Sequence, residues 1–463
     1  MLRSVFFLLS GNAVASLMGF ARTLFVARIL GVEDYGIAVT FALSTALVEM
    51  ASTIGLQKLI VQAREGDDPN WQAGLQGFHL LRGILAAAVL FAFAQPIATF
   101  FGVPDLAWAY QVLALVPLFL GFEHFDIHRL TRRKLYRPIL IYRVLPITAS
   151  VAAVWPLAWL FGDYRVMLYA LLIQWGLSAL ASHVTAERRY RLSLDRTIIG
   201  RTFSFGWPLL INNGLLFAVM EGDRVIVGRE LGLEILAIFS IGLTLTRMPI
   251  GIIRQSLSMF FLPRLSSAQD DPVRFVHLAH AVIKAALVAG LLLVLMVALI
   301  GGPVTNLLLG DKYTAVLPVL IWFAIWQAIN GFRTGISLIA LAQGKTRQLM
   351  LANIVRLTML PLAWVVAAKG ADFLMLIGIA IIGEVAAFGV GLMFLKYQSR
   401  LPLRAVVVYI ILAFSFLLLA AGNHLLIENP SKLGEWQWSR LYIIVPFAAI
   451  VFLMRDIIQR GRT

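Results

Sequence analysis

Apolar stretches of about 20 residues or more follow one another along almost the whole chain, separated by short polar segments. A helix needs about 20 such residues to cross the hydrocarbon core of a bilayer. The first stretch starts at Val5 and the last ends near residue 457, and we count about fourteen of them by this length criterion. Inside a bilayer every backbone N–H and C=O group needs a partner, which a helix supplies internally. The sequence therefore predicts an all-α polytopic membrane protein with about 14 transmembrane helices.

The composition excludes a soluble globular protein. Of the 463 residues, 60% are hydrophobic and 14% are charged, whereas a soluble domain has about 25% charged residues. The chain contains no cysteine, which excludes disulfides, thiol catalysis and cysteine metal sites. The first apolar run, Val5–Leu30, is too long for the apolar core of a signal peptide, so we expect a retained helix.

The distribution of Lys and Arg over the predicted loops indicates how the chain is oriented. The N-terminus and every second loop hold roughly 22 basic residues and the remaining loops roughly 5, and basic residues accumulate on the cytoplasmic side. We therefore expect both termini to be cytoplasmic. The net charge of +15 then follows from topology and from contact with anionic lipids of the cytoplasmic leaflet. A nucleic-acid partner is not needed to explain it.

One sequence pattern occurs twice. Residues 22–36 read RTLFVARILGVEDYG and residues 223–237 read DRVIVGRELGLEILA, so that Gly31 and Glu33 match Gly232 and Glu234 at a constant offset. In both copies we expect an apolar helix to end in a short turn that opens the next helix. The pattern indicates an internal duplication in which both halves have the same orientation, as in transporters built from parallel repeats. We predict two six-helix lobes, residues 1–190 and 191–400, around a central cavity, and two additional helices in residues 401–463.

Charged residues inside the predicted spans are the candidate functional residues. An arginine at the bilayer centre costs about 2.5–3.5 kcal/mol, so six of them facing lipid would exceed the about 5–15 kcal/mol that stabilises a typical fold. They must line water, pair with acids or meet a ligand, and an anionic substrate fits them because arginine binds phosphate in bidentate fashion. A purely structural pairing, for example of Arg224 with Glu221, stays open. The candidate substrate residues are Arg22, Arg224, Arg247, Arg254, Arg333 and Arg356, and the candidates for ion coupling or for pairing the lobes are Glu49, Glu221, Asp223 and Glu384.

Other polar groups near the span ends have a simpler explanation. We expect the long side chains of Lys58, Arg82, Arg143 and Lys284 to reach the cytoplasmic interface. His124 and His128 are four residues apart, as in helical metal sites, but the flanking pattern of such sites is missing, so we expect a solvated helix end here. We identify no catalytic triad, paired-carboxylate site or phosphate loop. The sequence predicts no enzyme activity, no cofactor and no metal.

Three segments resemble a known family. They are Ser10–Gly36 with its LGVEDYG turn, Phe205–Gly232 with its FGWP and DRVIVG motifs, and Phe261–Ser266. The chain resembles the polysaccharide biosynthesis (oligosaccharide flippase) family of the multidrug/oligosaccharidyl-lipid/polysaccharide (MOP) superfamily. Ala237, Ile238 and Phe239 stand where that family more usually has Gly-Tyr.

The resemblance implies a flippase of the bacterial inner membrane that moves undecaprenyl-pyrophosphate-linked oligosaccharide from the cytoplasmic to the periplasmic leaflet by alternating access. It would serve the biosynthesis of a surface polysaccharide such as lipopolysaccharide O-antigen or exopolysaccharide. The implied partners are the polyprenyl-pyrophosphate-linked glycan, membrane lipids and the glycan polymerase machinery. Three alternatives stay open: a peptidoglycan lipid-precursor flippase, a drug/cation antiporter of the same superfamily, and a membrane glycan polymerase or ligase. The antiporter predicts mainly acidic residues in the spans, where this chain has mainly basic ones.

Overall fold

The structure, a computed structural model, describes residues 2–52, 55–397 and 402–427. Every element in these residues is a helix. The chain divides into two units, Met1–Ala237 and Ile238–Thr463, which we describe one at a time. The predicted central cavity and the predicted lobe boundaries near residues 190 and 400 stay predictions. The predicted span near residues 439–457 lies outside the described residues.

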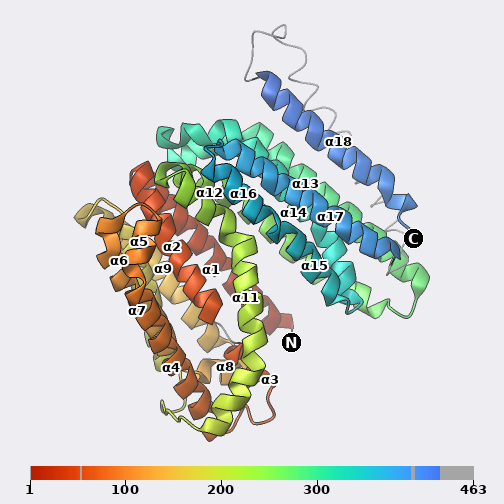
Figure 1. Ribbon diagram of the computed structural model, residues 1–463. Coiled ribbons are helices and arrows are strands. Elements are labelled where there is room, and N and C mark those ends of the chain that lie inside the picture. The colour runs from red at the N-terminus through yellow and green to blue at the C-terminus, as the bar shows by residue number, and fades with distance from the viewer. Residues whose placement is uncertain (1, 53–54, 398–401, 428–463) are drawn as a thin grey trace. The chain divides into compact units, whose positions relative to one another are not determined.

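The first unit consists of long helices that run side by side, joined by shorter ones (Figure 1). α9 packs against both α1 and α10, α4 packs against α7, and α11 packs against α2. The elements are α1 (Leu2–Ile29), α2 (Val32–Ser52), α3 (Leu56–Gln62), α4 (Pro69–Ala92), α5 (Ala94–Phe100), the 3₁₀ helix η1 (Pro104–Leu106), α6 (Ala107–Leu113), α7 (Leu115–Gly121), α8 (Asp126–Arg132), α9 (Arg137–Leu160), α10 (Arg165–Val184) and α11 (Arg196–Glu230).

The second unit has α14 at its centre, in contact with α13 and α17, while α15 packs on α17 and α18 packs on α13. Aromatic rings join three of these helices, because Phe332 of α14 lies 6.3 Å from Phe388 of α17 and 5.8 Å from Phe414 of α18. The elements are α12 (Leu233–Ser267), which begins within the first unit, α13 (Pro272–Leu309), the 3₁₀ helix η2 (Asp311–Val316), α14 (Leu317–Ala342), α15 (Thr346–Leu357), α16 (Met359–Ala368), α17 (Phe373–Tyr397) and α18 (Arg404–Ile427).

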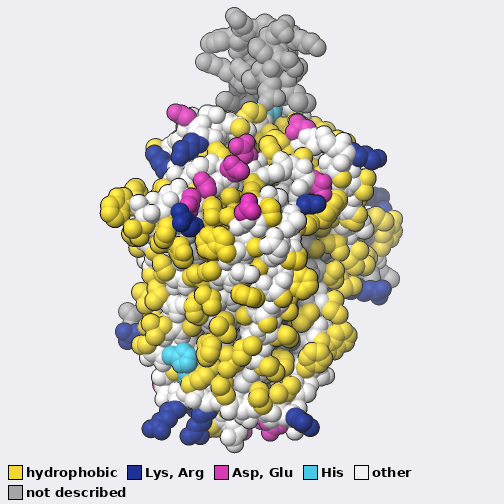
Figure 2. All heavy atoms as spheres, turned by 60° about the vertical axis from the view of Figure 1, so that its left-hand side comes forward, with side chains coloured by type: hydrophobic (Ala, Val, Ile, Leu, Met, Phe, Trp, Pro, Cys, Tyr) yellow, Lys and Arg dark blue, Asp and Glu magenta, His cyan; other side chains and the backbone are white. Residues whose placement is uncertain are grey.

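The helices define a multi-pass membrane protein. The described residues contain 11 helical segments long and apolar enough to cross a bilayer, and α1 and α2, with 28 and 21 residues, occupy two further predicted spans. On the face shown in Figure 2, hydrophobic side chains cover the middle, and Lys and Arg side chains lie mainly toward the upper and lower ends. The prediction of an all-α polytopic membrane fold is confirmed.

The repeated sequence pattern forms a helix–turn–helix in both places, as predicted. α1 ends at Ile29 and α2 begins at Val32, while α11 ends at Glu230 and α12 begins at Leu233. Gly232, in the second turn, has a φ of 90°, a conformation that glycine adopts without strain. The two copies touch each other, because a Cβ atom on Gly36 would overlap the backbone carbonyl of Leu233. A residue without a side chain therefore allows the two backbones to approach.

We expect Gly36→Ala to lower the free energy of unfolding by about 1–3 kcal/mol, because the added methyl group forces the two backbones apart. The measurement is the thermal unfolding midpoint of the purified protein in detergent. Gly214→Ala is the matched control, since nothing lies within 4 Å of its Cβ position and alanine favours a helix by about 0.5–1 kcal/mol. Equal midpoints for the two variants would refute the close contact.

Candidate functional site

The arginines predicted as substrate residues divide between the two units. Arg22 of α1 and Arg224 of α11 lie in the first unit. The second unit holds four, namely Arg247 and Arg254 of α12, Arg333 of α14 and Arg356 of α15. The structure connects three of these four through one acidic residue of α17.

The carboxylate of Glu384 is the centre of the charged groups in the second unit. Its side chain is fully buried, with Arg333 Nη1 2.7 Å from Oε2 and Arg356 Nε 2.7 Å from Oε1. Asn330 Nδ2 also donates a hydrogen bond to Oε1, at 2.8 Å. Two guanidinium groups and an amide thus satisfy both oxygens of one carboxylate, which offsets the cost of removing its charge from water.

Two asparagines extend this network. Asn330 Oδ1 accepts a hydrogen bond from Arg254 Nη1 at 2.9 Å, and Asn353 Oδ1 accepts one from Arg333 Nη2 at 3.1 Å. Arg254 is exposed. The charged groups of Arg333, Glu384 and Arg247 lie near enough to interact with its guanidinium group electrostatically. We call Arg254, Asn330, Arg333, Arg356 and Glu384 the arginine cluster. It holds three guanidinium groups and one carboxylate, so its excess charge is positive and suits an anionic ligand.

The two candidate arginines of the first unit have different partners. Arg22 Nη1 donates to Ser150 Oγ at 3.1 Å and also to Gln174 Oε1, which fixes its guanidinium to α9 and α10. Arg224 Nη1 lies 2.8 Å from Glu221 Oε2, one turn earlier in α11. This is the structural pairing that the sequence left as an alternative to substrate binding by Arg224. Asp223 lies beside Arg224 in the same helix.

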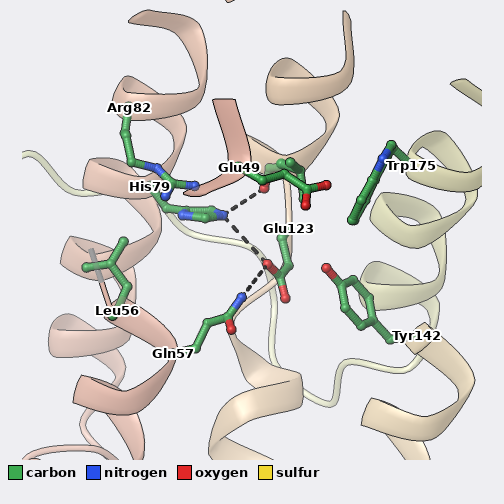
Figure 3. Close-up of a pocket in the computed structure, with 10 residues that line it drawn as sticks. Glu49, Leu56, Gln57, His79, Arg82, Glu123, Tyr142 and Trp175 are labelled. Atoms are coloured by element: carbon green, nitrogen blue, oxygen red, sulfur yellow. Dashed lines mark hydrogen bonds and ion pairs between the residues drawn. The ribbon is translucent and has the colours of Figure 1, made fainter. Parts of the chain in front are cut away.

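A cavity of about 160 Å³ lies inside the first unit (Figure 3). Charged, polar and aromatic side chains of several helices line it, together with Glu123, which follows α7. The lining includes Glu49 of α2, Gln57 of α3, His79 and Arg82 of α4, Glu123, Tyr142 of α9 and Trp175 of α10.

The carboxylate of Glu123 lies between two imidazole rings. His128 Nε2 is 2.8 Å from Oε1, and His79 Nε2 is 3.6 Å from Oε2. Gln57 Nε2 also donates to Oε2, at 3.4 Å, and the hydroxyl of Tyr142 points toward Glu123 in Figure 3. This arrangement places one carboxylate and two imidazole groups together inside the first unit.

The prediction of a solvated helix end at residues 123–128 is wrong. Glu123, His124, Asp126 and His128 are all buried, and so is Arg129. α7 ends at Gly121 and α8 begins only at Asp126, so the intervening segment turns into the protein. The segment after α10 covers it, with His124 Nε2 3.0 Å from the carbonyl oxygen of Arg188. The periodicity of a sequence does not reveal that a segment distant in the chain packs over these residues.

Two of the side chains expected at the cytoplasmic interface lie elsewhere. Lys284 is buried, and its ammonium group lies 4.1 Å from the centre of the Tyr409 ring, a cation–π contact that compensates a buried charge. Arg82 lines the cavity of the first unit, near Glu49 and Glu123 (Figure 3). Sequence reasoning thus missed the cavity, although a glutamate and two histidines in apolar surroundings were a usable signal.

Comparison with known proteins shows the family. The profile of the family described as polysaccharide biosynthesis protein matches residues 25–318, and the chain belongs to this family. Two curated relatives are similar to it. The amylovoran biosynthesis protein AmsL of Erwinia amylovora is 22% identical over 303 residues, which cover 61% of this chain and 74% of AmsL. The succinoglycan biosynthesis transport protein ExoT of Rhizobium meliloti is 26% identical over 315 residues, which cover 66% of this chain and 61% of ExoT.

Solved structures of low sequence identity share the fold of this chain. The lipid II flippase MurJ in an inward closed conformation aligns with a TM-score of 0.70 at 15% identity, covering 97% of this chain and 98% of MurJ. An inward-facing multidrug resistance MATE family transporter of the MOP superfamily aligns with a TM-score of 0.67 at 16% identity, covering 83% of this chain and 94% of that protein.

We expect Glu384→Gln to lower the free energy of unfolding by about 3–5 kcal/mol, because it leaves two guanidinium groups without their buried counter-charge. Glu65→Gln is the control, since Glu65 pairs with Arg201 at 3.1 Å on the surface, where an ion pair contributes about 0–1 kcal/mol. The measurement is unfolding of the purified variants in detergent. Similar losses for both variants would show that the Glu384 carboxylate does not hold the arginine cluster.

Proposed function

We propose that the protein is a flippase that moves undecaprenyl-pyrophosphate-linked oligosaccharide from the cytoplasmic to the periplasmic leaflet of a bacterial inner membrane. It works by alternating access, without catalysing a covalent reaction, and both termini are cytoplasmic. Its product is the substrate for the glycan polymerase machinery of a surface polysaccharide. The family assignment and the printed roles of AmsL and ExoT in polysaccharide biosynthesis and transport support this proposal.

The observation that carries the proposal is the excess positive charge of the arginine cluster. Arg333 and Arg356 each form an ion pair with Glu384. Within the described residues, the side chain of Arg254 donates its hydrogen bond to the neutral amide of Asn330. A pyrophosphate group offers several charged oxygens, which guanidinium groups bind in bidentate fashion. The polyprenyl tail needs no protein site, because it is soluble in the surrounding lipid.

The cavity of the first unit supports coupling to an ion gradient or to the membrane potential. Transfer of one charge across the membrane involves about 2.3 kcal/mol per 100 mV, which is large enough to drive or oppose transport. Glu49 and Glu123 are acidic groups within a polar cavity. A cation that enters this cavity balances the negative charge of their carboxylates.

A peptidoglycan lipid-precursor flippase is the second candidate. The similarity to the lipid II flippase MurJ, which covers 97% of this chain, favours it. Both candidate substrates carry a polyprenyl-linked pyrophosphate and differ in the sugar. Deletion of the gene separates them. Loss of surface polysaccharide, with the lipid-linked intermediate accumulating in the cytoplasmic leaflet, supports the oligosaccharide flippase. Lysis with arrested peptidoglycan synthesis supports the second candidate, and an unpolymerised intermediate in the periplasmic leaflet supports a polymerase or ligase.

We expect Arg247→Ala and Arg254→Ala each to reduce glycan export at least about tenfold, since a hydrogen bond to a charged group contributes about 1.5–3 kcal/mol. The measurement is surface polysaccharide in a deletion strain that carries each variant at equal membrane abundance. Arg264→Ala is the matched control, because Arg264 lies in the same helix but stacks on the Phe260 ring at 3.7 Å. Wild-type export by both test variants would exclude Arg247 and Arg254 as substrate residues.

A further inference from the structure

The segment that follows α10 is fixed to the end of the first unit by its backbone. Asp126 Oδ2 accepts hydrogen bonds from the N–H groups of Glu187 and Arg188, at 2.8 and 3.2 Å. Arg129 Nη2 lies 2.9 Å from Glu187 Oε2 and also binds Asp126. A buried ion pair thus holds the start of the segment in place.

A second set of contacts fixes the segment further along. Gln76 Nε2 of α4 donates to the carbonyl oxygen of Arg191 at 2.7 Å, and the N–H of Ser193 donates to the carbonyl oxygen of Ala73 at 3.0 Å. A side chain on Gly77 would overlap the backbone of Ser193. Residues 187–193 are therefore held against α4 and are not a free loop.

Three arginines of this segment line a pocket of about 230 Å³ against the start of α4. A single water needs about 10–15 Å³, so the pocket has room for a larger group. Arg188 binds neutral acceptors, with Nη1 3.0 Å from Gln72 Oε1 and Nη2 2.8 Å from the carbonyl oxygen of Asp67. The side chains of Arg189 and Arg191 are exposed and make no hydrogen bond or ion pair with any residue that the structure describes.

The neighbouring carboxylates do not neutralise these arginines. Asp67 lies 2.8 Å from Arg133 Nε, and Asp126 and Glu187 both bind Arg129. In and around the pocket these arginines outnumber these carboxylates, so positive charge is in excess. The arginines are Arg129, Arg132, Arg133, Arg188, Arg189 and Arg191, and the carboxylates are Asp67, Asp126 and Glu187. Burial, and after it the charge of Arg129, lower the pKa of Arg188. An anion in the pocket would relieve this repulsion.

We propose that this pocket, formed by Arg188, Arg189 and Arg191 with Gln72, binds a phosphate or diphosphate group at the cytoplasmic end of α4. Guanidinium groups bind the several oxygens of a phosphate in bidentate fashion, and none of the described residues that line the pocket is acidic. The group comes either from the headgroup of an anionic membrane lipid or from the pyrophosphate of a lipid-linked glycan. The site is separate from the arginine cluster, and it does not depend on which glycan is transported.

The test uses the full-length protein in nanodiscs of phosphatidylcholine. Inorganic diphosphate is titrated by calorimetry, and phosphatidylglycerol is added to the nanodiscs in a parallel series read by native mass spectrometry. We expect saturable binding that Arg189→Gln/Arg191→Gln weakens about tenfold or more, as the loss of one charged hydrogen bond predicts. The control Arg137→Gln/Arg196→Gln removes two exposed arginines from the same side and should stay within about twofold of wild type, since distant exposed charges are screened.

The two ligands identify the source of the phosphate. Binding of diphosphate without retention of phosphatidylglycerol supports the pyrophosphate of a lipid-linked glycan, and retention of phosphatidylglycerol supports a membrane-lipid headgroup. The proposal is overturned if the pocket variant binds like wild type, or if both double variants lose binding equally. Because binding is measured without transport, the result is independent of the export experiments above. Thermal midpoints should match wild type, because the two arginine side chains make no bonds within the described protein.

Discussion

The second unit depends on the compensation of one buried charge. A carboxylate without exposed surface is stable only if its partners replace the water it has lost. Glu384 obtains them from α14 and α15, and Asn330 connects the same carboxylate to Arg254 of α12. Four helices, α12, α14, α15 and α17, are thus tied to one polar centre. The same arrangement holds the guanidinium groups in position, where they outnumber the carboxylate.

The two units carry different polar chemistry. In the first unit two histidines flank Glu123 in a cavity, whereas in the second unit arginines surround Glu384. The similar sequences FHLLR at residues 78–82 and VHLAH at residues 276–280 match His79, which is buried, with His277, which is exposed. These two matching sequence positions therefore differ in burial. The first unit thus encloses imidazole and carboxylate groups, and the second unit encloses guanidinium groups around one carboxylate.

Charge at the basic end of the first unit is organised and does not form a diffuse basic surface. Asp67, Asp126 and Glu187 are used to position Arg129, Arg132 and Arg133. Asp126 and its ion pair with Arg129 fix the backbone of residues 187–193. This segment holds Arg188, Arg189 and Arg191 at defined positions. A flexible basic loop would be attracted to anionic lipid by charge alone, whereas a fixed pocket selects a ligand by its geometry.

The sequence alone determined the helical membrane fold, the repeated turn and the presence of charges within the spans, because hydrophobic length and local turn residues encode these features directly. It also indicated the family. Only the tertiary structure decided which charges meet. Glu384 lies beside Arg333 and Arg356, Glu123 lies between His79 and His128, and residues 187–193 cover a segment expected to be solvated. These contacts join helices distant in the sequence, and since the burial of a polar group depends on what packs over it, no local pattern can reveal it.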